Sequence, residues 1–153
     1  MAGDLGLVVS LTSEIAKRFE GLSLKPYVCP AGYWTIGYGH LCPAKQRPIS
    51  LAEAEEFLAL DVEAALRSVI RLCPVLLTEP ENKLATIVDF TFNLGAGRLA
   101  ASTLLRRLRA RDWDTVPVEL RKWVFGGGRK LPGLVLRREA EVVFFTKATP
   151  PPL

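Results

Sequence analysis

The chain has 153 residues, 49% of them hydrophobic and 24% charged, which is the balance of a single globular domain with a core of its own. No segment reaches the about 20 apolar residues of a membrane span, and the apolar residues 5–11 are not preceded by the basic residues of a signal peptide. Three cysteines are too few for a disulfide scaffold, and a single histidine argues against a zinc site. We therefore expect no metal and no cofactor.

The net charge of +4 conceals an asymmetry along the chain. Residues 98–138 carry eleven Lys and Arg against three Asp and Glu, which gives this segment a net charge of +8. Basic charge gathered in one segment favours an anionic polymer or surface as partner. For most of these arginines, a solvated helix face is the simpler interpretation.

The first predicted helix covers residues 12–21, with Thr12 or Ser13 as its cap and Gly21 at its end. Glu20 then lies in the last turn, where the helix dipole disfavours a negative charge on its carboxyl group.

Residues 24–40 are predicted to form a small twisted sheet. Tyr27–Val28 and Tyr33–Ile36 are β-prone, and residues 29–32 supply the turn between them. Gly37 and Gly39 flank Tyr38, a spacing that fits a sharp bend or a backbone close to a ligand.

The rest of the chain is predicted to be helical. Ser50 and Glu53 form a capping box that begins a helix of about twenty residues, ending near Cys73-Pro74. A strongly apolar helix over residues 78–94 is expected to form the buried centre of the larger lobe. Further helices are expected at about 102–112, 115–124 and 133–148, followed by a frayed tail over 149–153.

The spacing of three residues carries the strongest functional signal. Glu20 is followed after eight residues by Cys29 and after five more by Thr35. This spacing resembles the motif of the phage-type lysozymes, the endolysins of glycoside hydrolase family 24: a Glu, eight residues, an Asp or sometimes a Cys, five residues, then a Thr. Further landmarks of that family follow in the same order at residues 92–95, 102–105, 113–114, 123 and 133–141. The resemblance covers nearly the whole chain.

The resemblance implies an α+β fold, mainly helical, with two lobes in one lysozyme domain spanning 1–153. We expect a small antiparallel β-hairpin lobe at about 22–49, and a long connecting helix at about 50–72. A larger helical lobe is expected from 1–21 and about 74–148.

The resemblance also implies the activity. Phage lysozymes hydrolyse the β-1,4 bond between N-acetylmuramic acid and N-acetylglucosamine in peptidoglycan and so lyse the host cell. By this motif Glu20 is the general acid, and the hydroxyl of Thr35 orients the attacking water. Taken alone, Glu20 would be an ordinary surface residue before a helix-ending glycine, and Thr35 an ordinary β-branched strand residue.

Cys29 departs from the Asp found in most of the family. Its thiol has a reference pKa near about 8.5 and is a poor base at neutral pH. Three interpretations stay open: a thiolate made acidic by nearby cations, a neutral group that helps to hold water, or a structural turn cysteine. We infer inversion of configuration as a hypothesis, since one carboxylate and one positioned water fit a single displacement.

Four residues match places where the family lines its cleft: Tyr38, Leu41, Phe92 and Ser102. His40, the single histidine, is a further substrate-binding candidate: it is either a cleft residue or a hydrogen-bonded structural residue between the lobes. Phe92 is alternatively a core residue.

Two arginines of the last helix, Arg137 and Arg138, are candidate ion-pair partners of Glu20. We expect the contact to be partial or water-mediated, because a close cation would favour the ionised form of the acid. The alternative is two solvated arginines. Cys42 and Cys73 could form a disulfide that leaves Cys29 free.

The expected partner is peptidoglycan, with an anionic outer-membrane surface as a further candidate. No nucleic-acid motif accompanies the basic segment, so we expect no nucleic acid, and a monomer is the default. We expect synthesis in the host cytoplasm, action on the periplasmic wall, and export through a holin. The alternatives are a wall-binding protein that lost activity when Asp became Cys, and a cationic membrane-disrupting protein.

Overall fold

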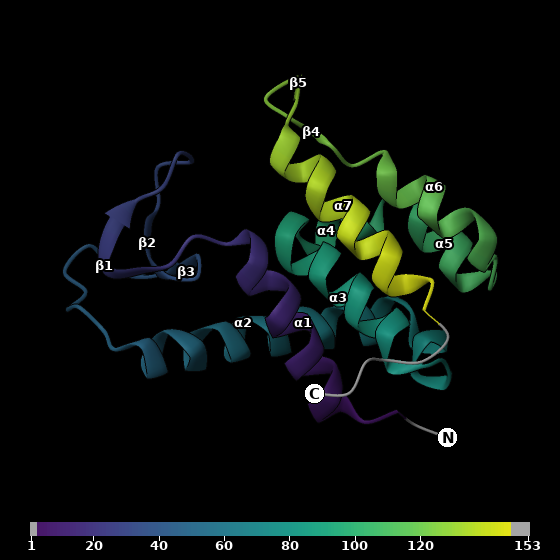
Figure 1. The fold of residues 1–153 in the computed structure, drawn as a ribbon, viewed down its shortest axis with the longest axis horizontal. Coiled ribbons are helices and arrows are strands. Elements are labelled where there is room, and N and C mark those ends of the chain that lie inside the picture. The colour runs from purple at the N-terminus through teal and green to yellow at the C-terminus, as the bar shows by residue number, and fades with distance from the viewer. Residues whose placement is uncertain (1–2, 148–153) are drawn as a thin grey trace.

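The computed structural model describes residues 3–147, which form two lobes joined by one long helix (Figure 1). The helices and strands in chain order are α1 (Leu5–Phe19), β1 (Ser23–Val28), β2 (Trp34–Gly37), β3 (His40–Leu41), α2 (Leu51–Leu72), η1 (Pro74–Thr78), α3 (Glu81–Leu94), α4 (Ala96–Ala100), α5 (Thr103–Arg109), η2 (Trp113–Thr115), α6 (Val116–Arg121), β4 (Phe125–Gly126), β5 (Arg129–Lys130) and α7 (Pro132–Phe145). The predicted fold class, mainly helical with a small antiparallel sheet, is confirmed.

Helix α1 begins seven residues before the start predicted from the sequence. Asp4 is its cap and accepts a hydrogen bond from the backbone N–H of Leu7 at 3.0 Å. Val8 and Leu11 lie fully or almost fully buried on the same helix, so the apolar stripe extends over the segment that the prediction left out. The helix ends at Phe19, and Glu20 is its C-cap residue with extended backbone. The prediction that Glu20 lies inside the last turn is therefore wrong by one position.

The β lobe is a three-stranded antiparallel sheet in the order β1-β2-β3. The predicted turn over residues 29–32 joins β1 to β2, and the Gly32 N–H donates to the Cys29 carbonyl at 2.8 Å. The core of this lobe is small. It consists of Ile36, Ile49 and Ala54, which are buried, with a few half-buried side chains around them.

Helix α2 begins as predicted. The Ser50 side chain accepts from the Glu53 N–H, and the Glu53 carboxylate accepts from the Ser50 N–H, so both halves of the capping box are present. Ala54 near its start packs in the small core, whereas Leu58 and Val62 further along pack in the large core of the helical lobe. One helix therefore contributes to both cores and fixes the distance between them.

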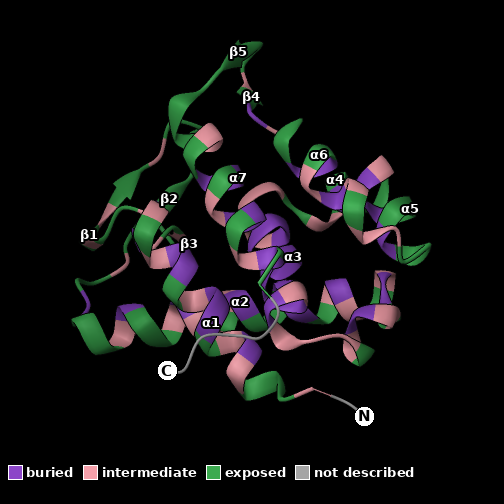
Figure 2. Cartoon of the chain, turned by 45° about the vertical axis from the view of Figure 1, so that its right-hand side comes forward, coloured by how far each residue is buried: buried purple, intermediate pink, exposed green. Residues whose placement is uncertain are grey.

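Helix α3 is the centre of the helical lobe, as predicted for the apolar segment. Nearly every residue from Asn82 to Thr91 is buried, and α1, α2 and α7 pack around it (Figure 2). The predicted start at residue 78 is wrong, because η1 and a Pro80 cap precede α3. The sequence analysis also missed α4 and the short β4–β5 ribbon. The predicted frayed tail, and the end of the last predicted helix at 148, lie outside the described residues.

Several arginines of the basic segment have structural partners. Arg109 donates from Nε to the Leu72 carbonyl at the end of α2, at 2.9 Å. Arg107 lies 3.7 Å from Asp112, and Arg111 lies 3.5 Å from Glu79. Part of the basic charge thus stabilises the helical lobe, through a hydrogen bond to a helix end and ion pairs between neighbouring segments.

All three cysteines are free. Cys42 lies beside the small core of the β lobe, and Cys73 is buried at the end of α2 in the large core. The two thiols belong to different lobes, so the disulfide considered between them does not form.

Two leucines of α2 provide a matched test of this packing. Leu58 is 1% exposed in the large core, whereas Leu60 is 57% exposed on the same helix. We expect Leu58→Ala to lower the free energy of unfolding by about 2–5 kcal/mol. Leu60→Ala should change it by no more than about 0.5 kcal/mol. Urea unfolding followed by circular dichroism measures both, and equal losses would contradict the assigned packing.

Candidate active site

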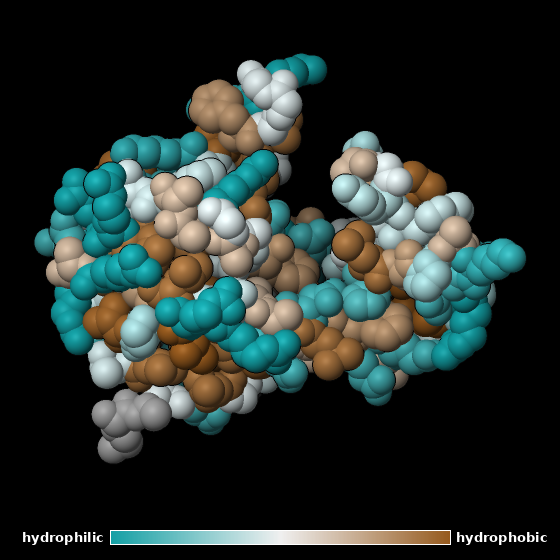
Figure 3. All heavy atoms as spheres, turned by 180° about the vertical axis from the view of Figure 1, so that it is seen from behind, coloured by the Kyte–Doolittle hydropathy of each residue, from teal (hydrophilic) through white to brown (hydrophobic). Residues whose placement is uncertain are grey.

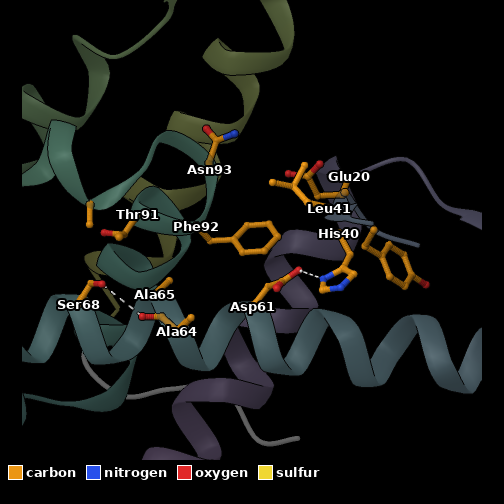
Figure 4. Close-up of a pocket in the computed structure, with 13 residues that line it drawn as sticks. Glu20, His40, Leu41, Asp61, Ala64, Ala65, Ser68, Thr91, Phe92 and Asn93 are labelled. Carbon is orange, nitrogen blue, oxygen red and sulfur yellow. Dashed lines mark hydrogen bonds and ion pairs between the residues drawn. The ribbon is translucent and has the colours of Figure 1, made fainter. Parts of the chain in front are cut away.

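A cleft of about 530 Å³ opens between the two lobes. Figure 3 shows the surface hollowed at this place, and Figure 4 shows the side chains that face it. The cleft is lined by Glu20, Tyr38, Gly39, His40, Leu41, Asp61, Ala64, Ala65, Ser68, Thr91, Phe92, Asn93 and Ala96. The lining comes from the end of α1, the β2–β3 turn, the middle of α2 and the end of α3.

Glu20 is the carboxyl group at one side of this cleft (Figure 4). Its side chain is 26% exposed, and Oε1 accepts a hydrogen bond from Nη1 of Arg137 at 2.8 Å. Gly39 has φ +82°, and a Cβ at this position would lie 3.5 Å from Oε2 of Glu20. The positive φ favours glycine here, and the turn thereby brings the β lobe close to the carboxyl group.

Glu20 also borders a second hollow of about 480 Å³. This hollow lies against Phe19 and the start of α7, over residues 131–134. Asn93 lines both cavities. Glu20 and Asn93 therefore border both hollows.

Arg137 holds Glu20 from α7, and its own position is fixed by Asp89. The Arg137 side chain is 3% exposed, and Asp89 is fully buried. Nε of Arg137 donates to Oδ2 of Asp89 at 3.0 Å, and Nη2 donates to Oδ1 at 2.7 Å. Burial lowers the pKa of Arg137, but its hydrogen bonds to Asp89 and Glu20 outweigh that effect and raise it, so the guanidinium stays charged.

The direct contact between Arg137 and Glu20 differs from the expected partial or water-mediated one. Their nitrogen and oxygen lie 2.8 Å apart. The expectation was wrong because it treated Arg137 as a free cation. In the structure, two of its nitrogens already bind a carboxylate, which offsets much of its charge.

Arg138 does not contact Glu20 but lies fully buried with other partners. Nη2 donates to Asn93 at 2.8 Å, and Nη1 donates to the Trp123 carbonyl at 3.3 Å. Nη2 also donates to Oε2 of Glu141 at 2.9 Å. Nε lies 2.7 Å from Oε1 of Glu141 without forming a hydrogen bond to it. The alternative of two solvated arginines on the last helix is wrong for both.

His40 combines the two roles considered for it. Its ring lines the cleft, and Nδ1 lies 2.8 Å from Oδ2 of Asp61 on α2 (Figure 4). The ring also stacks on Phe57, with centroids 4.4 Å apart. His40 therefore ties the β lobe to α2 and forms part of the cleft wall.

Three of the remaining predicted substrate residues, Tyr38, Leu41 and Phe92, line the cleft. Leu41 is 63% exposed, whereas Phe92 also packs against the large core. Ser102 does not line either hollow beside Glu20. Its hydroxyl caps α5, where it accepts from the Leu105 N–H and donates to the Leu99 carbonyl.

Cys29 and Thr35 lie on the β1–β2 hairpin and are also absent from the lining of the two hollows. The Thr35 hydroxyl donates to the Tyr33 carbonyl at 3.0 Å. A backbone hydrogen bond from Tyr33 lowers the pKa of the Cys29 thiol, with a further contribution from the Thr35 hydroxyl. The thiol and the hydroxyl are thus neighbours, and the cause of the lowered pKa is the hairpin itself rather than nearby cations.

Sequence reasoning missed Asp61, Asn93 and Asp89. Asp89 did leave a signal, since a carboxylate inside the apolar helix 84–91 must find a partner when it is buried. Asn93 lies in the family landmark at residues 92–95 but was given no role in the site, and Asp61 left no signal, because a polar residue on a helix is ordinary. Within residues 3–147, no cluster of three or more His, Cys, Asp or Glu side chains could hold a metal ion.

A family model described as phage lysozyme matches residues 17–141, which include Glu20, Arg137 and all the residues that line the cleft. The chain belongs to the phage lysozyme family. It is therefore a glycoside hydrolase of the lysozyme class whose substrate is peptidoglycan.

Relatives and solved structures agree with this family. An endolysin of Acyrthosiphon pisum secondary endosymbiont phage 1 is 37% identical over 139 residues, which cover 88% of this chain and 94% of that protein. A SAR-endolysin of Escherichia phage Mu is 33% identical over 144 residues, 94% of this chain and 83% of that protein. The chain spans about half the length of the Bacillus phage B103 endolysin, to which it is 38% identical over 136 residues, 86% of this chain and 51% of that protein.

Two solved structures have the same fold. The muramidase domain of SpmX from Asticaccaulis excentricus gives a TM-score of 0.78 at 27% identity, covering 89% of this chain and 95% of that chain. An endolysin from Escherichia coli O157:H7 phage FAHEc1 gives 0.78 at 26% identity, covering 93% and 94%. None of the helices within residues 3–147 combines the length and the hydropathy of a membrane span.

The three free cysteines should differ in reactivity. Burial raises the pKa of Cys42 and of Cys73, whereas the pKa of Cys29 is lowered, so Cys29 carries the largest thiolate fraction at a given pH. We expect iodoacetamide to alkylate Cys29 first and the buried Cys73 last in the folded protein. Peptide mass spectrometry over time measures the order, and the unfolded protein is the control. Equal rates in the folded state would contradict the assigned environment of Cys29.

Proposed function

We propose that Glu20 is the general acid with which this lysozyme cleaves the β-1,4 bond between N-acetylmuramic acid and N-acetylglucosamine. The observation that carries the proposal is its carboxyl group, partly buried on the border of two hollows and held by one hydrogen bond from Arg137. A proton donor to a departing sugar oxygen must be fixed in the cleft and shielded in part from water. Glu20 meets both conditions.

The two hollows support a polymeric substrate. A glycan strand that is cut within its length must extend on both sides of the broken bond. The hollows of about 530 and 480 Å³, both bordered by Glu20, offer space for both parts. Tyr38, Leu41 and Phe92 give the larger hollow aromatic and apolar walls against which sugar faces can pack.

We assign the positioning of the attacking water to Thr35, with the neighbouring Cys29 thiol as its helper. The pair lies on the hairpin of the opposite lobe, and the lowered pKa of Cys29 increases the fraction of thiolate, the form that accepts a hydrogen bond from water best. Glu20 gives its proton to the departing oxygen, and the held water attacks the anomeric carbon while its own proton passes to the Cys29 thiolate or to solvent; this single displacement inverts the configuration.

We further propose that the protein is a monomer that is made in the host cytoplasm, reaches the wall through a holin and acts on the periplasmic side. The exposed cations of the basic segment 98–138 then favour contact with anionic wall polymers or the outer-membrane surface.

The first test is Glu20→Gln. This change keeps the shape of the side chain and removes its transferable proton, so the rate of wall hydrolysis should fall by about 100- to 10,000-fold while wall binding persists. Loss of turbidity of purified peptidoglycan measures hydrolysis, and co-sedimentation with it measures binding.

The matched control is Glu14→Gln, because Glu14 lies in α1 with a side chain 68% exposed, and within residues 3–147 it forms an ion pair with Lys17 alone. This variant should clear peptidoglycan at the wild-type rate. Clearing by Glu20→Gln at the rate of the control would rule out the assigned role of Glu20.

A second candidate function is wall binding without catalysis, and Cys29 at the place of the family's Asp favours it. We expect the wild-type protein to be active and Cys29→Ala to lower its rate by about tenfold, the equivalent of one hydrogen bond to water. Cys29→Asp should keep or raise the rate. If only Cys29→Asp clears peptidoglycan, the natural protein is a wall-binding protein.

A further inference from the structure

The buried carboxylate of Asp89 has no role in the proposed reaction, yet it holds the residue that touches the acid. A cation in contact with a carboxyl group favours its ionised form, and a general acid must carry its proton. Arg137 lies 2.8 Å from Glu20, so an uncompensated Arg137 would work against proton donation. The group that offsets the positive charge of Arg137 therefore affects whether Glu20 keeps its proton.

Asp89 supplies that compensation with a fixed geometry. Two parallel hydrogen bonds, of 3.0 and 2.7 Å, join its carboxylate to Nε and Nη2 of Arg137. The guanidinium also lies over the rings of Phe19 and Phe92, at 5.5 and 5.9 Å from their centroids. The ion pair and the rings set the position of the guanidinium, so that Nη1 reaches Glu20.

We propose that Asp89 is a positioning residue of the reaction: it neutralises and orients Arg137, which then fixes the Glu20 carboxyl group through one hydrogen bond without removing its proton. The inference rests on the proposed role of Glu20 as the acid. Asp89 acts through Arg137 and does not touch the substrate, because it is fully buried.

The other ionisable groups near this arrangement do not replace Asp89. Tyr38 and His40 from the β lobe and Asp61 from α2 line the cleft with Glu20, but Arg137 is its one ion-pair partner among residues 3–147. His40 and Asp61 pair with each other.

Glu141 on α7 lies next to Asp89 in the buried interior. Burial, and then the carboxylate of Asp89, raise the pKa of Glu141 well above its usual range, against the opposing effect of Arg138. The raised pKa favours the neutral form of Glu141, whose partner is Arg138. Asp89 is the buried carboxylate that faces the Arg137 guanidinium, through two hydrogen bonds.

The test is Asp89→Asn, which keeps the size of the side chain and removes its charge. Arg137 then acts on Glu20 uncompensated, and the ionised acid becomes more favourable. We expect the alkaline limb of the pH profile of kcat/KM on purified peptidoglycan to move to lower pH by about one unit. A carbon-13 NMR titration of the Glu20 carboxyl group should show its midpoint moving in the same direction, whatever the remaining rate.

The matched control is Glu141→Gln, which also removes a buried carboxyl group next to the same network. Because Glu141 pairs with Arg138 and not with Arg137, this variant should leave the alkaline limb where the wild type has it, even if it changes stability. A limb that moves equally in both variants, or in neither while both are folded, overturns the proposal.

A second variant covers the case in which Asp89→Asn does not fold, since it leaves Arg137 buried without its partner. Asp89→Asn combined with Arg137→Gln removes both charges. Its alkaline limb should lie at or above the wild-type pH, with a lower kcat because Glu20 is no longer held. A limb below that of the wild type overturns the proposal. If instead Glu20→Gln retains full activity, the proposed function fails, and Asp89 is not the cause.

Discussion

The ion pair between Arg137 and Asp89 is the interaction on which the cleft depends. The pair joins α7 to α3 inside the helical lobe. The third guanidinium nitrogen of Arg137, Nη1, donates to Glu20 at the end of α1. Three helices therefore meet at one guanidinium. A buried pair contributes little net stability when its desolvation cost is counted, but removal of one partner leaves an uncompensated charge. The main effect of the pair is to fix the position of the Glu20 carboxyl group.

Around this pair, the two lobes differ in how they are built. The helical lobe packs around α3, which is buried on nearly all sides, whereas the β lobe has a core of only Ile36, Ile49 and Ala54. Helix α2 runs through both cores, and the contact between His40 and Asp61 adds a second link beside the cleft. The cleft is the space between a large helical lobe and a small β lobe that share helix α2.

Local signals in the sequence were sufficient for much of this structure. The capping box at Ser50, the turn at residues 29–32 and the apolar helix ending at Leu94 each follow from short-range chemistry, and all three are present. The motif placed Glu20 in the cleft. What sequence could not provide were contacts between distant residues: Arg137 meets Asp89 across 48 positions, and only the fold brings them together. Nor does the sequence show that the Ser102 hydroxyl caps α5, a local role that the prediction of a substrate contact did not consider.

The small core of the β lobe affects how the activity depends on temperature. The proposed acid stands on the well-packed lobe, whereas Cys29 and Thr35 stand on a hairpin supported by few buried side chains. Regions with few buried contacts open at a lower free energy than the whole molecule unfolds. Opening of the hairpin moves the proposed water-positioning pair, Cys29 and Thr35, away from Glu20 while the helices persist. The temperature at which such an enzyme stops working therefore lies below its melting temperature, and cooling restores the activity without refolding of the larger lobe.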